Sequence, residues 1–360
     1  MTSNQETTPV VSDPGGATPV PVAQESLAGP GGSRGSGLGG RLMGSSAGRL
    51  LGLVVALVVL GLVGFATAGG QFTSVDNLLT ILRLAAVIGV VSVGMTFVIT
   101  GGGIDLSVGA IVALASIWST TLATQTMANQ YHWSLMVFTA VAVGTACGLV
   151  NGLLVAYGRV VPFIATLAML AAARGLAEII AQRRTQIVDV PGFSNFFRAS
   201  VLGVPLLVII FAVVAVIGWV VLNRTTFGRR TFAVGGNPEA ARLAGIDVRR
   251  HTVMLYAIVG LCSGIAAVMI VARTTTGSST HGGLYELDAI AAVVIGGTLL
   301  SGGRGTIVGT VLGVLIFTVL SNVFTQNNLS SSAQSVAKGL IIVVAVLLQQ
   351  RLARRSNTGT

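Results

Sequence analysis

The amino-acid sequence predicts an all-α membrane protein of about ten transmembrane helices, arranged as two inverted repeats. Three observations support this prediction. Of the 360 residues, 52% are hydrophobic and only 9% are charged, whereas soluble domains carry about 25% charged residues. The hydrophobic residues gather in long runs with few charges, and short motifs of the first half recur in order in the second half. A chain of this composition cannot cover itself with charge, so lipid must be its main solvent.

The N-terminal residues 1–46 predict a disordered cytoplasmic tail, because they are rich in Gly, Pro, Ser and Thr and lack a periodic hydrophobic pattern. The first hydrophobic run, Leu50–Ala68, ends like a signal-peptide cleavage site. It is longer than a signal core and lies far from the N-terminus, so we expect a transmembrane helix. The membrane domain is expected over residues 47–352, followed by a short cytoplasmic tail, 353–360.

Nine further hydrophobic runs approach or reach the length of about 20 residues that a transmembrane helix needs. They cover residues 79–100, 105–125, 133–157, 163–182, 202–222, 252–273, 287–301, 306–324 and 334–351. The run at 287–301 is short for a bilayer. A tilted helix and one half of a broken helix are the alternatives for it.

The arginines predict the orientation through the positive-inside rule. They precede the first helix, crowd the segment 224–251 and end the chain. With ten helices, all three of these regions lie in the cytoplasm, together with both termini. The loop that holds Arg183, Arg184 and Arg198 is an exception, because the same count places it outside.

An internal repeat links the two halves of the chain. Three pairs of segments match in order: IDLSVGAIVAL with YELDAIAAVVI (Ile104–Leu114 with Tyr285–Ile295), VGTACG with VGTVLG (Val143–Gly148 with Val308–Gly313) and ARGL with AKGL (Ala173–Leu176 with Ala337–Leu340). The repeats comprise helices two to five and seven to ten, which start five helices apart. An odd shift reverses orientation, so we expect inverted repeats, a recurring design of transporters with the path at the repeat interface.

Charged and glycine-rich positions within these segments are the candidate path, because a charge at the bilayer centre costs on the order of 3 kcal/mol. Ser107 and Asp288 take the same repeat position and are good N-cap types. Helix capping and direct contact with a solute are therefore alternatives for both. The residues that we expect at the translocation path or at helix breaks are Gly102, Gly103, Asp105, Ser107, Glu286, Asp288, Gly296 and Gly297.

Arg174 and Lys338 occupy matching repeat positions inside predicted helices. For both we expect snorkelling or an internal ion pair. Glu178 lies four residues after Arg174 on the same helix face and is the candidate partner of this arginine.

A short, well-capped helix is predicted in the cytoplasmic segment 224–251. Asn237 is a good N-cap, Pro238 suits the first helical position and Glu239 favours the positive N-terminal end. Gly245 can take the left-handed position that ends a helix. One face then carries Ala240, Leu243 and Ala244. Such a helix suits docking to a partner; a solvated connector is the alternative.

Three segments together resemble a known family. GGIDLSVGAIVALAS, NPEAARLAGIDV and YELDAIAAVVIGGTLLSGGRGTIVGTVLGVL closely resemble the membrane permease subunits of ribose-, xylose- and other monosaccharide-type ABC importers, over about residues 47–352. The resemblance implies a sugar permease in a bacterial cytoplasmic membrane. It also implies three partners: a second permease copy, identical or different, a cytoplasmic ABC ATPase and an extracytoplasmic sugar-binding protein.

The resemblance further implies that EAARLAG (Glu239–Gly245) is the coupling helix that fits into a groove of the ATPase. Its expected coupling residues are Asn237, Pro238, Glu239, Ala240, Ala241, Leu243, Ala244 and Gly245. The resemblance does not identify the sugar.

The sequence predicts a transport subunit, not an enzyme. It contains no phosphate-binding G-x-x-x-x-G-K-[ST] loop, and its one lysine, Lys338, lacks the preceding glycines of such a loop. We expect no catalytic residue, metal or cofactor in this chain, with ATP and Mg²⁺ on the partner ATPase. A permease for another solute (a branched-chain amino acid, nucleoside or autoinducer), a stand-alone secondary transporter and a structural membrane subunit are the alternatives.

Overall fold

A computed structural model of the chain describes residues 46–341 and residue 343. These residues belong to a compact unit that begins at Gly44. The predicted tails, 1–46 and 353–360, lie outside the described residues except for Ser46, where the first helix starts.

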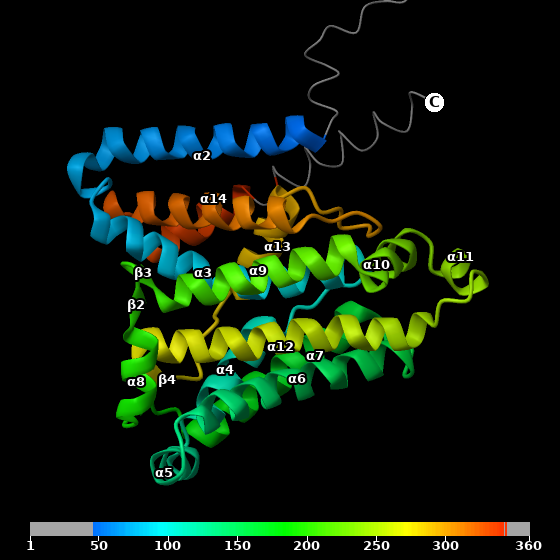
Figure 1. Cartoon of the computed structure of the whole chain (residues 1–360), viewed down its shortest axis with the longest axis horizontal. Coiled ribbons are helices and arrows are strands. Elements are labelled where there is room, and N and C mark those ends of the chain that lie inside the picture. Colours follow the sequence, from blue (N-terminus) through cyan, green and yellow to red (C-terminus); the bar gives the residue numbers. More distant parts are fainter. Residues whose placement is uncertain (1–45, 342, 344–360) are drawn as a thin grey trace, which may run out of the picture. The chain divides into compact units, whose positions relative to one another are not determined.

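Helices form nearly all of the regular structure in the described part of the chain (Figure 1). They are α2 (Ser46–Ala68), the 3-10 helix η1 (Gly69–Gln71), α3 (Val75–Thr100), α4 (Val108–Ser119), α5 (Leu122–Gln130), α6 (Ser134–Ala156), α7 (Pro162–Ala181), α8 (Pro191–Arg198), α9 (Leu206–Arg224), α10 (Thr226–Gly236), α11 (Pro238–Leu243), α12 (Val248–Thr274), α13 (Tyr285–Ile295) and α14 (Ile307–Gln326). Residues 331–341 are also helical.

Two small antiparallel pairs of strands complete the described structure. β1 (Gln186–Ile187) pairs with β4 (Thr276–Gly277), and β2 (Ser200–Val201) pairs with β3 (Val204–Pro205). The first pair matters for the path, because it ties the segment after α7 to the segment between α12 and α13.

The predicted all-α membrane protein is confirmed. Seven described helices are long and apolar enough to cross a bilayer, and the bent pair α4–α5, with an angle of 55°, can supply an eighth span. Over the residues that the structure describes, the predicted hydrophobic runs coincide with helices, but two are shortened. The run at 105–125 yields α4 of 12 residues, and the run at 287–301 yields α13 of 11 residues. Of the tenth run, only the part up to residue 341, together with residue 343, is described.

Local sequence signals explain where many helices begin. Seven described helices start after a residue whose side chain accepts a hydrogen bond from a backbone N–H three positions on, which satisfies a donor that the helix leaves free. These residues are Ser74, Thr121, Thr225, Asn237, Asp247, Thr306 and Ser330.

The core is centred on α12, which packs against α6, α3 and α4. Glycines allow the closest of these contacts. Gly144, Gly148 and Gly152 of α6 face α12, and a Cβ atom on Gly144 would lie 2.5 Å from the carbonyl oxygen of Gly260. Small residues let two membrane helices approach to backbone contact. By contrast, α2 packs on α14 and leaves most of its surface exposed.

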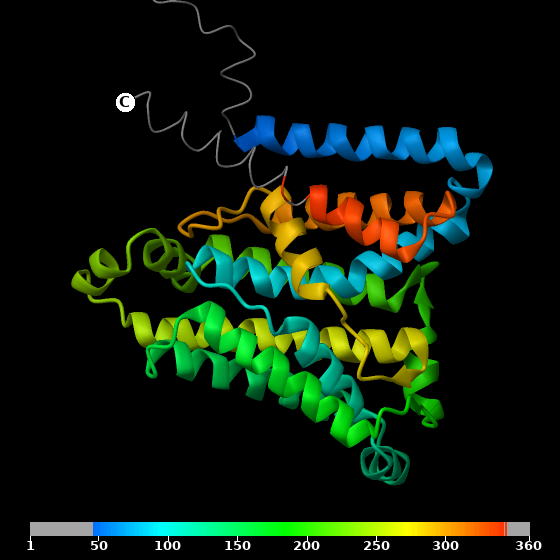
Figure 2. The ribbon, with the colours of Figure 1, turned by 180° about the vertical axis from the view of Figure 1, so that it is seen from behind.

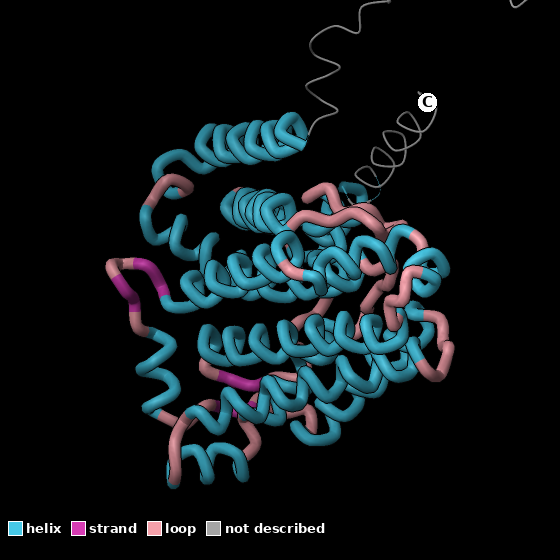
Figure 3. The backbone as a smooth tube through the Cα atoms, turned by 45° about the vertical axis from the view of Figure 1, so that its right-hand side comes forward, coloured by secondary structure: helices cyan, strands magenta, loops and turns pink. Residues whose placement is uncertain are grey.

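The two ends of the helix bundle differ in structure. Figure 1 shows α8 and the strands at one end, and α10 and α11 at the opposite end. Figure 3 shows the same separation, with the strand pairs on one side and long loops on the other. The short helix predicted for coupling therefore lies at the far end from the segment that holds Arg198.

Candidate translocation path and coupling segment

Two helices begin partway along the bundle rather than at one of its ends. The chain leaves α3 at Thr100, turns at Gly102 with φ of +83° and stays non-helical until α4 starts after Ser107. In the second half, α13 starts after Leu284, which has φ of +64°. Figure 2 shows α4 (teal) and α13 (yellow to orange) leaving the middle of the bundle in opposite directions. This geometry supports the predicted inverted repeat.

The starts of these two helices touch through their backbones. A Cβ atom on Gly109 would lie 2.2 Å from the carbonyl oxygen of Gly282, and one on Gly282 would lie 2.5 Å from the carbonyl oxygen of Gly109. Both glycines are therefore required by the packing. The N-terminal ends of two helices, each with free N–H groups and a partial positive charge, meet at this point.

A buried polar cluster holds the break before α4. Asp105 is fully buried, and its Oδ1 accepts hydrogen bonds from the backbone N–H of Ser107 at 2.8 Å and from its hydroxyl at 2.5 Å. Asn151 of α6 donates to the same hydroxyl at 2.8 Å. Within the described residues, Asp105 Oδ2 and Asn151 Oδ1 have no hydrogen-bond partner. Buried polar atoms rarely lack a hydrogen-bond partner, so this cluster is a candidate part of the translocation path.

The capping role expected for Ser107 and Asp288 is wrong for both side chains. Ser107 does occupy the N-cap position of α4, but its hydroxyl is engaged by Asp105 and caps no helix N–H. At α13 the N-cap is Leu284, so Asp288 lies inside the first turns of the helix. There it pairs with Lys338 at 3.1 Å. Lys338 thus has the internal ion pair that its position predicted.

Glu286 lies between the two halves. Its Oε2 atom is buried without a hydrogen-bond partner in the described structure, and a Cβ atom on Gly109 would lie 2.5 Å from it. The carboxylate therefore sits against the first turn of α4, where the helix dipole favours negative charge.

Arg174 crosses from α7 to the segment ahead of α13. Its guanidinium donates to the carbonyl oxygens of Ser279 and His281. The expected pair with Glu178 is not formed, because Glu178 instead pairs with Arg183 at 3.5 Å. Burial, together with Arg273 and Arg174, lowers the pKa of His281 to about 4, so this imidazole is neutral at pH 7.

Gly296 and Gly297 end α13, as their assignment to a helix break predicts. A Cβ atom on Gly296 would lie 2.5 Å from backbone atoms of Gly309 in α14. Gly297 has φ of +91° and open space around it. The first glycine therefore allows close packing and the second allows the turn.

The predicted coupling helix is present as α11. Asn237 accepts a hydrogen bond from the backbone N–H of Ala240 at 3.0 Å, Pro238 takes the first turn, and Glu239 pairs with Arg242 at 3.0 Å. Gly245 follows the helix with φ of +82°. This local structure agrees with the sequence prediction at every cap.

The exposed face of α11 is partly apolar. Ala240, Leu243 and Ala244 are all exposed, and the exposed fraction of Leu243 is 80%. Ala241, predicted among the coupling residues, is buried and packs α11 onto the protein instead. A short helix that presents a large apolar side chain to water at the tip of the molecule has the features of a docking element.

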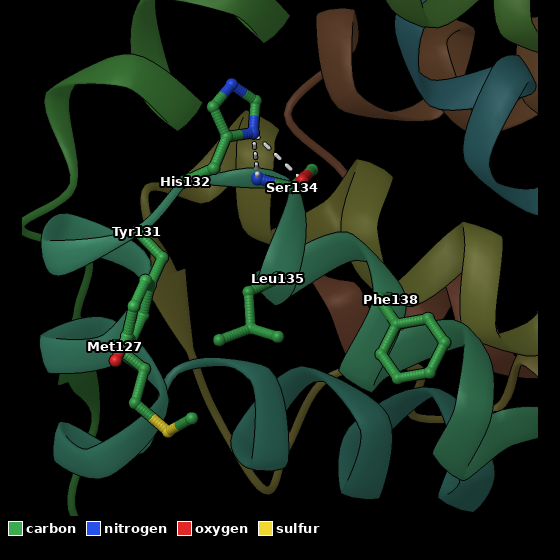
Figure 4. Close-up of a pocket in the computed structure, with 6 residues that line it drawn as sticks. All are labelled: Met127, Tyr131, His132, Ser134, Leu135 and Phe138. Atoms are coloured by element: carbon green, nitrogen blue, oxygen red, sulfur yellow. Dashed lines mark hydrogen bonds between the residues drawn. The ribbon is translucent and has the colours of Figure 1, made fainter.

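One hollow was not predicted from the sequence. It lies between α5 and α6, has a volume of about 400 Å³ and is lined mainly by apolar side chains (Figure 4). Two hydrogen bonds at this hollow join His132 Nδ1 to Ser134, one with the hydroxyl at 2.9 Å and one from the backbone N–H at 3.2 Å. None of its lining residues comes from α4 or α13, so it is separate from the contact between the starts of these two helices.

Comparison with known proteins is informative over most of the chain. The family model described as branched-chain amino acid transport system / permease component matches residues 77–348. The chain is 42% identical over 306 residues to the ribose import permease protein of Bacillus subtilis (strain 168), covering 84% of this chain and 92% of the relative.

Two further relatives show similar coverage. The ribose import permease protein of Escherichia coli (strain K12) is 38% identical over 305 residues, with 83% of this chain and 92% of the relative covered. The galactose/methyl galactoside import permease protein of the same organism is 35% identical over 312 residues, with 82% and 92% covered. No solved structure matches.

Proposed function

This chain belongs to the branched-chain amino acid transport system / permease component family, and we propose that it is the membrane permease subunit of an ABC importer for a monosaccharide of the ribose type. The observation that carries this function is the similarity to ribose import permeases, at 38–42% identity over more than four fifths of the chain. The galactose relative extends the same assignment to monosaccharides as a class.

The importer works with an ATPase and a binding protein. This chain has no phosphate-binding loop in its sequence, so ATP and Mg²⁺ bind on the ATPase. We propose that α11 docks into that ATPase through its exposed face, which includes Ala240, Leu243 and Ala244. The extracytoplasmic binding protein supplies selectivity, so the permease itself does not need to bind sugar tightly.

The transport step is alternating access. ATP-driven closure of the ATPase pushes α11, and the motion rocks the helices around the point where the starts of α4 and α13 meet. This contact supports the proposal because it joins the two halves of the chain through the backbones of Gly109 and Gly282. Such contacts between inverted repeats, at helices broken inside the membrane, are a common location for a transport path.

We further propose that two permease copies form the path and that both termini lie in the cytoplasm. The docking of α11 to a cytoplasmic ATPase places α10 and α11 inside, and therefore α8 and the strand pairs outside. The exposed apolar faces of the spanning helices, α2 foremost, contact lipid or the second copy.

Reconstituted transport tests this function. The permease, its cognate ATPase and its binding protein are placed in proteoliposomes, and uptake of radiolabelled ribose, galactose and leucine is measured with and without ATP. We expect ATP-dependent uptake of a monosaccharide that the binding protein also binds. ATP-dependent uptake of leucine would favour the solute in the family's description instead. Sugar uptake driven by an ion gradient, without ATP or partners, would identify a secondary transporter.

A further inference from the structure

Three segments far apart in the sequence meet through their backbones next to α11. They are the end of α3, the end of α10 and the loop between α13 and α14. We call their meeting point the glycine junction; it consists of Thr100, Gly102, Gly235, Gly302 and Gly303. The first of these segments leads into the break before α4, the third follows α13 in the second repeat, and the second leads directly into α11.

Gly235 is at the centre of the glycine junction. A Cβ atom on this residue would lie 1.9 Å from the carbonyl oxygen of Thr100 and 2.6 Å from the backbone nitrogen of Gly303. Those two neighbours are themselves joined, because the N–H of Gly303 donates to the carbonyl oxygen of Thr100 at 2.9 Å. Gly235 is therefore packed against a hydrogen bond that links the two repeats.

The other glycines bring the three segments into direct contact. Gly302 and Gly303 have φ of +84° and +73°, which only glycine adopts without strain. A Cβ atom on Gly302 would lie 2.7 Å from the carbonyl oxygen of Gly235 and 2.8 Å from the Cα atom of Gly102. All three segments are thus in direct main-chain contact, without side chains between them.

Main-chain contact makes the glycine junction stiff. A side chain at an interface can change rotamer and absorb a displacement, whereas close-packed backbone atoms must move together. No flexible linker separates the glycine junction from α11, because α10 ends at Gly236 and Asn237 already caps α11. A second contact holds α10 in place, where the Thr231 hydroxyl and His251 Nε2 of α12 are 2.9 Å apart.

We propose that the glycine junction passes the motion of α11 to both repeats at once, and that Gly235 is the positioning residue for this coupling. The proposal rests on the proposed function, since it assumes an ATPase that moves α11. A push on α11 displaces the end of α10, and the glycine junction then moves the break before α4 and the loop after α13 as one unit. Both half-helices, α4 and α13, are continuous with those segments.

Two adjacent glycines provide a matched test. The Cβ atom of Gly235→Ala collides with backbone atoms of Thr100 and Gly303, whereas that of Gly236→Ala meets only the Cα atom of Gly303, at an ordinary 3.9 Å. Both substitutions add one methyl group at the end of the same helix. Sugar uptake and ATP hydrolysis are measured on the reconstituted importer, normalised to the amount of assembled complex.

We expect Gly235→Ala to lower the number of sugar molecules imported per ATP by about fivefold or more, the lower end of typical coupling between sites. Gly236→Ala should keep the wild-type ratio. An unchanged ratio for Gly235→Ala, with or without less assembled complex, would reduce the glycine junction to ordinary packing and overturn the proposal. The proposed function fails separately, if the wild-type complex shows no ATP-dependent sugar uptake.

A second pair of variants tests the same idea from the loop between α13 and α14 if Gly235→Ala does not assemble. The Cβ atom of Gly302→Ala would lie 2.7 Å from the carbonyl oxygen of Gly235, whereas that of Gly297→Ala meets nothing within 4 Å. Both glycines have positive φ, so the backbone strain is matched and only the contact with α10 differs. We expect Gly302→Ala to import fewer sugar molecules per ATP than Gly297→Ala, and equal ratios would contradict the proposal.

Discussion

At the residue scale, the buried polar groups of the break before α4 bond to one another, and we predict that their role is mainly structural. Asp105 accepts two hydrogen bonds from Ser107, and Asn151 extends the cluster from another helix. The sequence identified Asp105 and Ser107 by their position at a helix start. It did not identify Asn151, because an asparagine in the middle of a hydrophobic run has no partner that can be read from its neighbours.

Asp105→Ala removes, at a fully buried position, the acceptor for both the backbone N–H and the hydroxyl of Ser107. We expect a loss of about 1–3 kcal/mol in stability, because unsatisfied buried donors carry their desolvation cost. The amount of assembled complex and its thermal midpoint should fall, while competition among sugars keeps its order. Asp105→Asn retains an acceptor oxygen and should lose less. Normal uptake by Asp105→Ala with a changed order of sugars would instead make Asp105 a sugar-contacting residue.

The pair of Asp288 and Lys338 is largely shielded, with side-chain exposed fractions of 16% and 23%. Asp288→Leu or Lys338→Met alone leaves a shielded charge without its partner, which should cost on the order of 1–3 kcal/mol. The double variant removes both charges and should be more stable than either single variant. Thermal unfolding of the four proteins in detergent measures this coupling. Additive losses would mean that the two charges do not depend on each other.

At the element scale, α11 was predictable because its signals are local. Asn237, Pro238 and Gly245 act on backbone groups within a few positions of themselves, so spacing alone identifies them. The starts of α4 and α13 were less predictable. Leu284 rather than Asp288 occupies the N-cap position of α13, and Gly282, just before it, packs against Gly109 of α4.

Variants of α11 test its coupling role. Gly245→Pro cannot adopt φ of +82°, because proline is restricted to about −65°. Glu239→Arg replaces an ion pair with Arg242 by a repulsion at the positive end of the helix. We expect both to lower ATP-driven uptake and the stimulation of ATPase activity, Gly245→Pro more strongly. Gly245→Asn, which tolerates the left-handed conformation, is the control. Full coupling in both test variants would exclude α11 as the docking helix.

At the scale of the whole molecule, the orientation in the membrane can be measured directly. Leu202 and Leu243 lie at opposite ends of the bundle, with exposed fractions of 99% and 80%. In a background with Cys147→Ala and Cys262→Ala, we expect Leu202→Cys to react with an impermeant thiol reagent in intact cells. Leu243→Cys should react only after the membrane is opened. The reverse pattern would place α11 outside and remove its proposed contact with a cytoplasmic ATPase.

The sequence and the structure together define how the two halves of the chain are arranged. The sequence repeat pairs Ile104–Leu114 with Tyr285–Ile295, and the structure places the corresponding helices, α4 and α13, end to end with opposite directions (Figure 2). The matched positions nevertheless have different partners. Asp288 pairs with Lys338, whereas its counterpart Ser107 binds Asp105, because the surroundings of the two breaks contain different side chains.

The sequence by itself determined the helical membrane class, the positions of the hydrophobic segments and the caps of α11. These features depend on composition, on the length of apolar runs and on interactions between residues a few positions apart. Only the tertiary structure decided that Gly235 packs against Thr100 and Gly303, and that Arg174 reaches Ser279 and His281. Such contacts join segments more than 60 positions apart. Their partners are chosen by how the helices pack, and no local spacing in the chain encodes that choice.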